Sequence, residues 1–297
     1  MHALALVGVA LALLVLAAVA AIALGAARWS SGTATLRAEL DATREPHAPA
    51  GYDPRDIEVL PPPVKRYLRA ALTPGQHLVA AVHLSHAGQF NMGEAEARWK
   101  PFKSTQLTVT RRPGFDWDGR IAMAPGLNAC VHDAYVAGEG RLHAAFLGWF
   151  TLVDQRGTPE LASGELMRFL AETPWYPTAL LPGQGVRWEA LDDRSARATL
   201  TDGATTVSLD FRFDADGLIA SVRSPARHRS VGDKTVLTPW VGRFWNYEDR
   251  EGMRVPREGE VAWEMAEGLR PYWRGHLDSI AFEFAQQRGL NSRGGGP

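Results

Sequence analysis

The sequence predicts a mainly β domain of the α+β class, carried by one N-terminal transmembrane helix. Three observations support this prediction: an uncharged apolar run at the start, apolar residues that alternate with polar ones after residue 75, and Asp- and Gly-rich turns between the alternating runs. Alternation with such turns is typical of an antiparallel meander with one dry face. We therefore expect a curved antiparallel sheet or half-barrel with one or two packed helices.

The N-terminal run at 3–27 contains no charged residue and consists mostly of Ala, Leu, Val and Ile. As a helix it would extend about 37 Å, enough to cross a hydrocarbon core of about 30 Å. Arg28 and Trp29 follow, a cation and an aromatic that suit the membrane interface. A cleaved signal peptide is the alternative, with small residues near Ala26, but the run exceeds the roughly 7–15 residues of a signal core and lacks a positive start. The sequence favours a retained anchor at 1–29 and a single-pass protein of the cell membrane.

The flanking charges and the usual arrangement of anchored domains predict opposite orientations of the chain in the membrane. Arg28, Arg37 and Arg44 follow the run, and under the positive-inside rule alone they would leave the C-terminal domain in the cytoplasm. Glu39 and Asp41 dilute these cations, and long domains translocate with little regard to charge. An N-terminal anchor that feeds an exported domain is the commoner arrangement, and it favours the extracytoplasmic side.

Composition divides the rest of the chain. Residues 30–59 are polar and contain several prolines, so we predict a linker there. The prolines at 61–63 suit the first turn of a helix, and an apolar stripe with helical spacing follows until the stop signal at 73–75. The antiparallel β domain should occupy 60–285, and the tail at 286–297 is expected to be disordered.

The clearest strand pattern lies at 186–222. Four alternating apolar runs are separated there by turns at Asp192 and Asp193, at Asp202 and Gly203, and at 214–217. Further strands are predicted at 107–110, 115–123, 243–247, 259–265 and 273–284.

One helix interrupts the strands. Pro159 suits its first turn, and apolar residues from Ala162 to Leu170 share a face. The helix should end near Glu172, because Pro174 disfavours helical geometry in the residue before it. A helix in the middle of many strands suggests a sheet wrapped round it.

Composition also excludes several classes of function. The chain has 32 Lys and Arg against 33 Asp and Glu, whereas a nucleic-acid-binding protein needs a clustered cationic surplus. Its single cysteine, Cys130, excludes an internal disulfide and a thiolate zinc site within one chain. Cys130 lies in a strand-like run without a neighbouring cation, which indicates an inert, buried thiol.

No metal or cofactor is expected. His83 and His86 would lie on opposite faces of a strand because three positions separate them, and the adjacent His132 and Asp133 would also point apart. The sequence has no phosphate loop, dinucleotide fingerprint, nucleophile elbow or His-Glu-x-x-His helix. These absences favour a non-enzymatic role.

The chain contains ten tryptophans, an unusually high number. They indicate a large aromatic core or a cavity lined by aromatic side chains. The apolar segment at 175–182 could close the mouth of such a cavity or simply cross the core, and core filling is the commoner use. Arg168 and Glu172, four apart on the central helix, could form a buried site, but an ordinary ion pair is the favoured interpretation. The candidate cavity lining is Trp175, Tyr176, Trp188, Trp240, Arg168 and Glu172.

Several stretches together resemble an uncharacterised bacterial family of membrane-anchored domains of unknown function. They are LPPPVKRYL at 60–68, PGFDWD at 113–118, LMRFLAE at 166–172, WYPTALLP at 175–182, WEALDD at 188–193, PWVGRF at 239–244, GEVAW at 259–263 and YWRG at 272–275. The resemblance implies one domain with an N-terminal membrane segment and carries over no functional residue. The strand pattern is also similar to the lipoprotein-carrier half-barrels, a likeness of fold alone.

The sequence is consistent with three functions. The first is a membrane-tethered, non-enzymatic domain that binds an apolar ligand such as a lipid or acyl chain, with the bilayer as a partner through residues 3–27. The second is a structural or protein-interaction module at the membrane with a filled core. The third is a hydrolase-like enzyme that uses carboxylates such as Glu172 and Asp192 or Asp193. An open apolar interior would separate the first from the second, and the third requires ionisable groups that converge with shifted pKa values.

Overall fold

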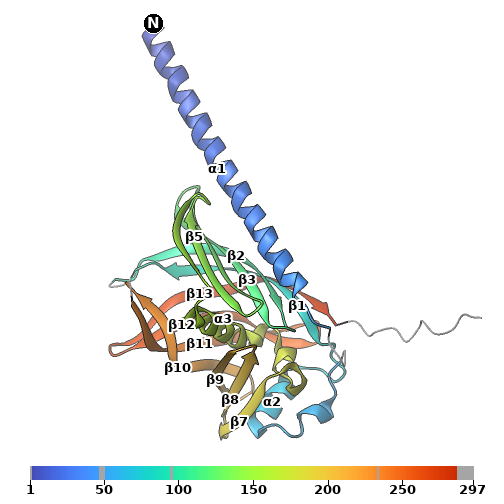
Figure 1. The fold of residues 1–297 in the computed structure, drawn as a ribbon. Helices are drawn as coiled ribbons and strands as arrows, with labels where there is room; N and C mark the ends of the chain where they lie inside the picture. The colour runs from blue at the N-terminus through green and yellow to red at the C-terminus, as the bar shows by residue number, and fades with distance from the viewer. Residues whose placement is uncertain (1, 47–50, 94–95, 233, 286–297) are drawn as a thin grey trace, which may run out of the picture.

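The chain forms one long helix and one strongly curved antiparallel sheet of 13 strands (Figure 1). This computed structural model describes residues 2–46, 51–93, 96–232 and 234–285, so the tail predicted at 286–297 lies outside the described residues. The strands are β1 (Val79–Asn91), β2 (Trp99–Val109), β3 (Gly114–Ala124), β4 (Leu127–Val136), β5 (Glu139–Phe146), β6 (Phe150–Arg156), β7 (Arg187–Asp192), β8 (Ser195–Asp202), β9 (Thr205–Phe213), β10 (Ile219–Val231), β11 (Lys234–Arg250), β12 (Met253–Met265) and β13 (Gly268–Phe284). The helices are α1 (His2–Ala42), α2 (Pro62–Ala71) and α3 (Pro159–Ala171), with the short 3₁₀ helices η1 (Pro54–Ile57), η2 (Thr173–Trp175), η3 (Pro177–Leu180) and η4 (Pro182–Gln184).

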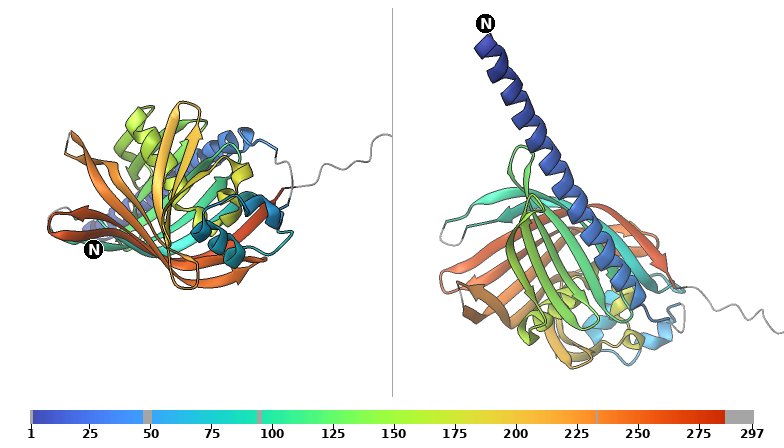
Figure 2. Two further views of the ribbon diagram at one scale, coloured as in Figure 1. Left: turned by 90° about the horizontal axis from the view of Figure 1, so that it is seen from below. Right: turned by 45° about the horizontal axis from the view of Figure 1, so that its top comes forward.

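The strand order explains why α3 lies inside the curve of the sheet. The order is β6-β5-β4-β3-β2-β1-β13-β12-β11-β10-β9-β8-β7, and the paired neighbours are antiparallel. The chain therefore starts at the centre, reaches one edge at β6, and crosses through α3 to the opposite edge at β7. From there it returns to the centre, and the sheet curls round the crossing segment (Figure 2). The prediction of a mainly β fold with a curved antiparallel sheet is confirmed.

Both predicted helices of the domain are present. In α2 the apolar stripe is buried, with Val64, Tyr67 and Leu68 fully enclosed. The Thr158 side chain caps the first turn of α3 by accepting from the Leu161 amide, and α3 ends at Ala171, next to the predicted end. The core lies on the concave face of the sheet, between the strands and these two helices.

The linker predicted at 30–59 is wrong in its first part, because α1 continues to Ala42. One face of this extension packs against the convex side of β2, β3 and β4. The buried residues are Gly25, Trp29, Thr33 and Leu40, which recur at helical spacing. Trp29 was expected at the membrane interface, but its side chain is enclosed between the helix and the sheet.

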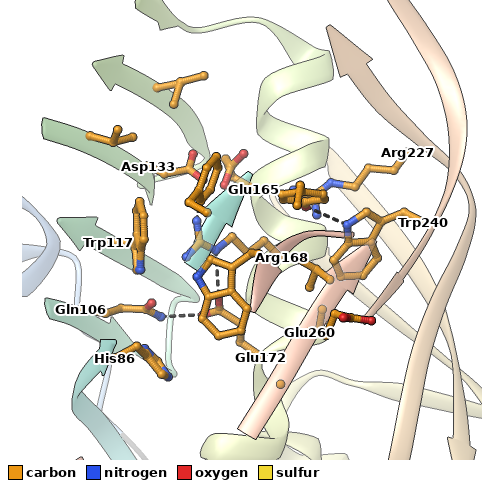
Figure 3. Close-up of a pocket in the computed structure, with 18 of the residues that line it drawn as sticks. His86, Gln106, Trp117, Asp133, Glu165, Arg168, Glu172, Arg227, Trp240 and Glu260 are labelled. Carbon is orange, nitrogen blue, oxygen red and sulfur yellow. Dashed lines mark hydrogen bonds and ion pairs between the residues drawn. The ribbon is translucent and has the colours of Figure 1, made fainter. Parts of the chain in front are cut away.

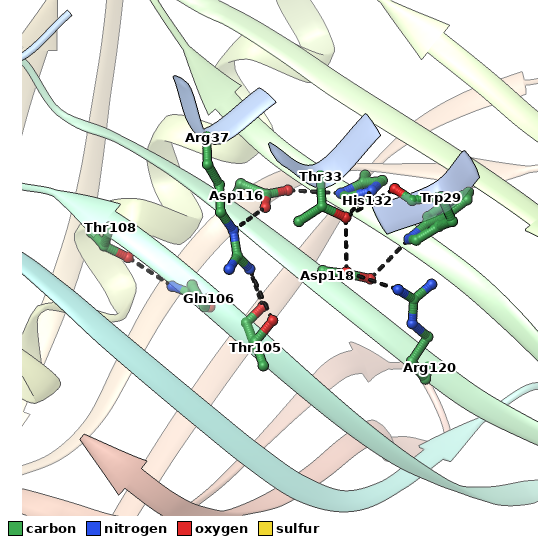
Figure 4. A network of polar contacts seen from close by, with 10 residues as sticks. All are labelled: Trp29, Thr33, Arg37, Thr105, Gln106, Thr108, Asp116, Asp118, Arg120 and His132. Carbon is green, nitrogen blue, oxygen red and sulfur yellow. Dashed lines mark hydrogen bonds and ion pairs between the residues drawn. The ribbon is translucent and has the colours of Figure 1, made fainter. Parts of the chain in front are cut away.

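A buried polar network joins α1 to the convex face (Figure 4). Asp118 accepts from the Trp29 indole at 3.0 Å and from the Thr33 hydroxyl at 3.0 Å. Asp116, which is fully buried, accepts from Arg37 Nε at 2.9 Å and contacts His132 Nδ1 at 2.8 Å. Since polar groups this deep are stable only with partners, the network fixes the C-terminal half of α1 on the domain.

The other half of α1 extends away from the sheet (Figure 1). Its most apolar 18-residue window is entirely unburied, and the helix is long and apolar enough to cross a membrane. Signal sequences share these properties.

Candidate functional site

A cavity of about 360 Å³ lies on the concave face of the sheet, between α3 and the strands (Figure 3). Its wall is mainly aromatic and aliphatic. Ionisable side chains lie on the side of α3, and Arg227, Arg243 and Glu260 reach the wall from β10, β11 and β12. The lining residues are His86, Phe90, Met92, Gln106, Trp117, Ile121, Val131, Asp133, Leu142, Ala144, Glu165, Arg168, Ala171, Glu172, Trp175, Arg227, Trp240, Arg243, Phe244, Gly259, Glu260, Val261, Tyr272 and Trp273.

The indole N–H groups of two wall tryptophans are bound by the protein. Trp175 donates to the Pro256 carbonyl at 3.0 Å, and Trp240 donates to the Tyr272 hydroxyl at 2.8 Å. Trp175 also meets Trp273 at a ring-centroid distance of 6.4 Å in an edge-on arrangement. Because these polar ends are already paired, the rings offer the cavity an apolar surface.

Two side chains of α3 and that of its C-cap residue share the face that lines the cavity. Glu165, Arg168 and Glu172 recur at helical spacing. Arg168 donates to Asp133 at 2.5 Å and to Glu172 at 2.7 Å, and its guanidinium lies 5.2 Å from the centroid of the Trp117 ring. Burial lowers the pKa of Arg168, but Glu172, Asp133 and Glu165 outweigh it and raise that pKa, so the cation is permanent.

Four buried atoms at this site have no hydrogen-bond partner among the described residues. They are both ring nitrogens of His86, Gln106 Oε1 and Glu165 Oε2. The Gln106 amide nitrogen is occupied, donating to Glu172 at 2.6 Å and to Thr108 at 2.9 Å. Buried polar atoms without partners are costly, and at a cavity wall they are the groups that a ligand would satisfy.

The pKa values of two of these groups are shifted in favour of the uncharged form. Burial, then the charges of Arg168 and His276, lower the pKa of His86 to about 3. Burial, followed by the negative charge of Asp133, raises the pKa of Glu165 well above its ordinary value. Arg168 lies between two carboxylates, those of Asp133 and Glu172, and the cavity wall also carries the cation of Arg227.

Four of the six predicted site residues line the cavity, namely Arg168, Glu172, Trp175 and Trp240. Tyr176 and Trp188 are not among its lining residues. The Tyr176 hydroxyl donates to the Phe169 carbonyl at 2.7 Å inside the core, and the Trp188 indole donates to the Leu180 carbonyl at 3.0 Å. The segment is buried from 175 to 181, so the core-crossing interpretation describes most of it.

Sequence reasoning missed His86, Gln106, Asp133 and Glu165 as cavity residues. Glu165 could have been found, because it lies one helical turn before Arg168 on the same face. His86 and Asp133 were considered only as metal ligands. His83 and His86 do lie on opposite faces, since His83 is exposed and contacts Glu283 at 2.7 Å while His86 is buried.

A family model described as a family of unknown function, DUF6920, matches residues 58–282. The chain belongs to this family. The match confirms the resemblance that the sequence motifs indicated, and it covers the domain from α2 to β13 without α1. No curated protein matches the chain.

Two solved structures are similar to this DUF6920 chain. One is a LolA superfamily protein, NE2245, from Nitrosomonas europaea, with 10% identity, a TM-score of 0.39 and coverage of 74% of this chain and 92% of that one. The other is a β-barrel-like protein of the domain of unknown function DUF1849 from Brucella abortus, with 9% identity, a TM-score of 0.23 and coverage of 69% and 99%. Similarity at this level carries no functional argument.

In this DUF6920 chain, Glu165→Gln is expected to stabilise the protein at neutral pH. Between the ordinary pKa of 4.5 and the raised one, the folded protein keeps a proton that the unfolded chain releases. The contribution of Glu165 to stability therefore falls as pH rises, by about 1.4 kcal/mol per pH unit. Denaturant unfolding of the variant should show a stability gain that is absent below about pH 4 and grows above it. The matched control is Glu160→Gln, an exposed position of α3. A gain that does not vary with pH would contradict the assignment.

Proposed function

We propose that this protein is a membrane-tethered, non-enzymatic domain that binds an apolar ligand, such as a lipid or an acyl chain, in the cavity beside α3. The observation that carries the proposal is the cavity itself, about 360 Å³ of unfilled space walled mainly by aromatic and aliphatic side chains. Ligand pockets of roughly 300–1,000 Å³ have this composition, with a few convergent polar groups that fix orientation. A packed core of the same size would leave no such space.

The polar group at α3 indicates what the ligand carries besides its apolar part. His86 and Gln106 Oε1 provide donor and acceptor sites, and Glu165 Oε2 is a further polar atom without a partner among the described residues. The cation of Arg168 is engaged by Asp133 and Glu172, so it is not free to hold an anion. A hydroxyl or an amide suits the uncharged groups, and a carboxylate or phosphate would suit Arg227, which lines the same cavity and forms no ion pair with a described residue.

The tether is the second part of the proposal. The exposed, uncharged half of α1 would cross the cell membrane once, with the domain on the extracytoplasmic side. We place the domain on that side because exported domains commonly follow an N-terminal anchor. Arg28, Arg37 and Arg44 alone would favour the cytoplasm. The paired state of Arg37 and Arg44, which contact Asp116 and Glu283, weakens the argument from these cations.

One observation favours a second candidate, the carboxylate-dependent hydrolase. Burial, followed by the charge of Asp133, raises the pKa of Glu165, which is the environment of a general acid. The carboxylates named from the sequence do not converge, because Asp192 and Asp193 are exposed in the β7–β8 turn while Glu172 lines the cavity. Hydrolysis of p-nitrophenyl acyl esters that is lost in Glu165→Gln would support this candidate.

Ligand binding is tested by native mass spectrometry and lipid analysis of detergent-extracted, full-length protein. We expect a co-purifying apolar molecule. The variant Ala144→Phe places a ring in the cavity wall, and a steric cost of about 1–3 kcal/mol to the bound state corresponds to a loss of roughly 5- to 150-fold in affinity. The matched control is Ala190→Phe, the same change at an exposed position of β7. Equal ligand content in both variants, or bare wild-type protein, would refute the proposal.

A further inference from the structure

The hairpin formed by β5 and β6 contacts the apolar half of α1. Trp149, in the turn of the hairpin, donates its indole N–H to the Ala21 carbonyl at 2.7 Å. Gly25 allows the close approach, since a Cβ there would lie 2.2 Å from the Leu147 carbonyl oxygen. The Arg28 guanidinium lies 5.5 Å from the centroid of the Trp149 ring. The tip of this hairpin therefore marks the last contact between the domain and α1 on the way to the N-terminus (Figure 1).

The same tip exposes large apolar side chains. Trp149 is 39% exposed, Phe150 66% and Leu152 58%. The stretch at 144–153 contains no charged residue. Exposed aromatic and aliphatic side chains grouped in this way on an edge strand mark a surface that meets an apolar partner.

A second uncharged turn lies beside the first. The turn between β3 and β4 belongs to an uncharged stretch at 121–131, and its Met123 is 37% exposed. The Leu147 amide donates to the Asn128 carbonyl at 3.0 Å, which ties the two turns together. At the opposite end of these strands, the β2–β3 turn carries Arg111 and Arg112. The apolar end of the sheet is thus the end that faces the apolar half of α1.

The length of α1 places the bilayer boundary at this tip. The part of α1 that precedes Ala21, residues 2–20, would extend about 28 Å, close to a hydrocarbon core of about 30 Å. With that part in the core, Ala21, Gly25 and the Trp149 ring lie at the level of the headgroups. Tryptophan favours this level because its ring is apolar and its N–H is polar.

We propose that the tip of the β5–β6 hairpin, together with the adjacent β3–β4 turn, inserts into the interfacial layer of the bilayer that α1 spans. This inference rests on the proposed membrane anchor. The bilayer, rather than a protein, is the occupant because the exposed side chains are continuous with the membrane-spanning half of α1. Ala144, on the same strand as the tip, lines the cavity, so insertion would bring the cavity wall next to the lipid.

The test uses full-length protein in vesicles of phosphatidylcholine and phosphatidylglycerol. Three single-cysteine variants, each in a Cys130→Ala background, carry an environment-sensitive fluorophore at Phe150→Cys, Leu11→Cys or Ala190→Cys. Spin-labelled lipids with nitroxides near the headgroup or deep in the acyl region then quench each probe according to its depth. Thermal unfolding of the Cys130→Ala protein checks that the background is folded.

We expect the probe at position 150 to shift to shorter emission wavelength and to be quenched by the shallow nitroxide, while the probe at position 190 behaves as in water. The probe at position 11 should be quenched by the deep nitroxide. Quenching at position 11 with a water-like signal at position 150 would overturn the hairpin inference and leave the anchor intact. A water-like signal at position 11 would overturn the anchor itself, and with it this inference.

Discussion

Replacing Asp116 by alanine is expected to lower the free energy of unfolding by about 3 kcal/mol and to loosen the C-terminal half of α1. Asp116 is fully buried and holds both Arg37 and His132. Its loss leaves two polar partners without their acceptor, and the one-quarter exposure of Arg37 keeps the expected cost at the lower end of the range for buried pairs.

Denaturant unfolding in detergent measures this loss, and hydrogen exchange locates it. Amides at 29–42 should exchange faster in Asp116→Ala, while those of the central strands β1 and β13 should change little. The control is Asp154→Ala on edge strand β6, where the carboxylate is half exposed and the expected change is within about 0.5 kcal/mol. Unchanged protection at 29–42 would show that the polar network does not hold α1.

His86→Phe is expected to make the protein more resistant to acid. Burial keeps the pKa of His86 near 3 in the folded state, against an ordinary value of 6.5. Between these values the unfolded chain binds a proton that the folded protein does not, so stability is present above pH 6.5 and is lost as pH falls, by about 1.4 kcal/mol per pH unit. The difference in unfolding free energy between variant and wild type should therefore increase by about 2 kcal/mol from pH 7 to pH 5.

Phenylalanine keeps the aromatic contact that His86 makes with Trp175, whose ring centroid lies 4.7 Å away. The measurement is denaturant unfolding at a series of pH values, and subtracting the wild-type curve removes the opposing effect of Glu165. The control is the same change at a partly exposed position of β10, His228→Phe. A difference between His86→Phe and wild type that stays constant with pH would contradict the assignment.

The fold was predictable where one face of a strand is buried and the other is exposed to solvent. Strands β8 and β9 show that alternation directly, and the Asp- and Gly-rich turns around them occur where the sequence placed them. Strands β5 and β6 were not predicted, because apolar and polar residues do not alternate in the uncharged stretch at 144–153. The extension of α1 to Ala42 was missed because its buried stripe combines Trp29 and Leu40 with the polar Thr33, so it does not look apolar.

The candidate site was predictable only within one element at a time. Arg168 and Glu172 are an i, i+4 pair, and the structure brings them together at 2.7 Å. Asp133, the other partner of Arg168, comes from β4. This contact could not be predicted, because the alternation of apolar and polar residues does not give the order of the strands in the sheet. The same holds for His86 and Gln106, which reach the cavity from β1 and β2.

Photo-crosslinking tests the central claim, that the curved sheet encloses an apolar ligand beside α3. Full-length protein in detergent would be incubated with a fatty acid or fatty alcohol that carries a diazirine in its chain, irradiated, digested and mapped by mass spectrometry. We predict adducts on peptides that contain the wall residues Trp117, Trp175, Trp240 or Trp273, reduced in Ala144→Phe and retained in Ala190→Phe. Adducts confined to α1, with none on the cavity wall, would contradict the claim that the sheet encloses an apolar ligand.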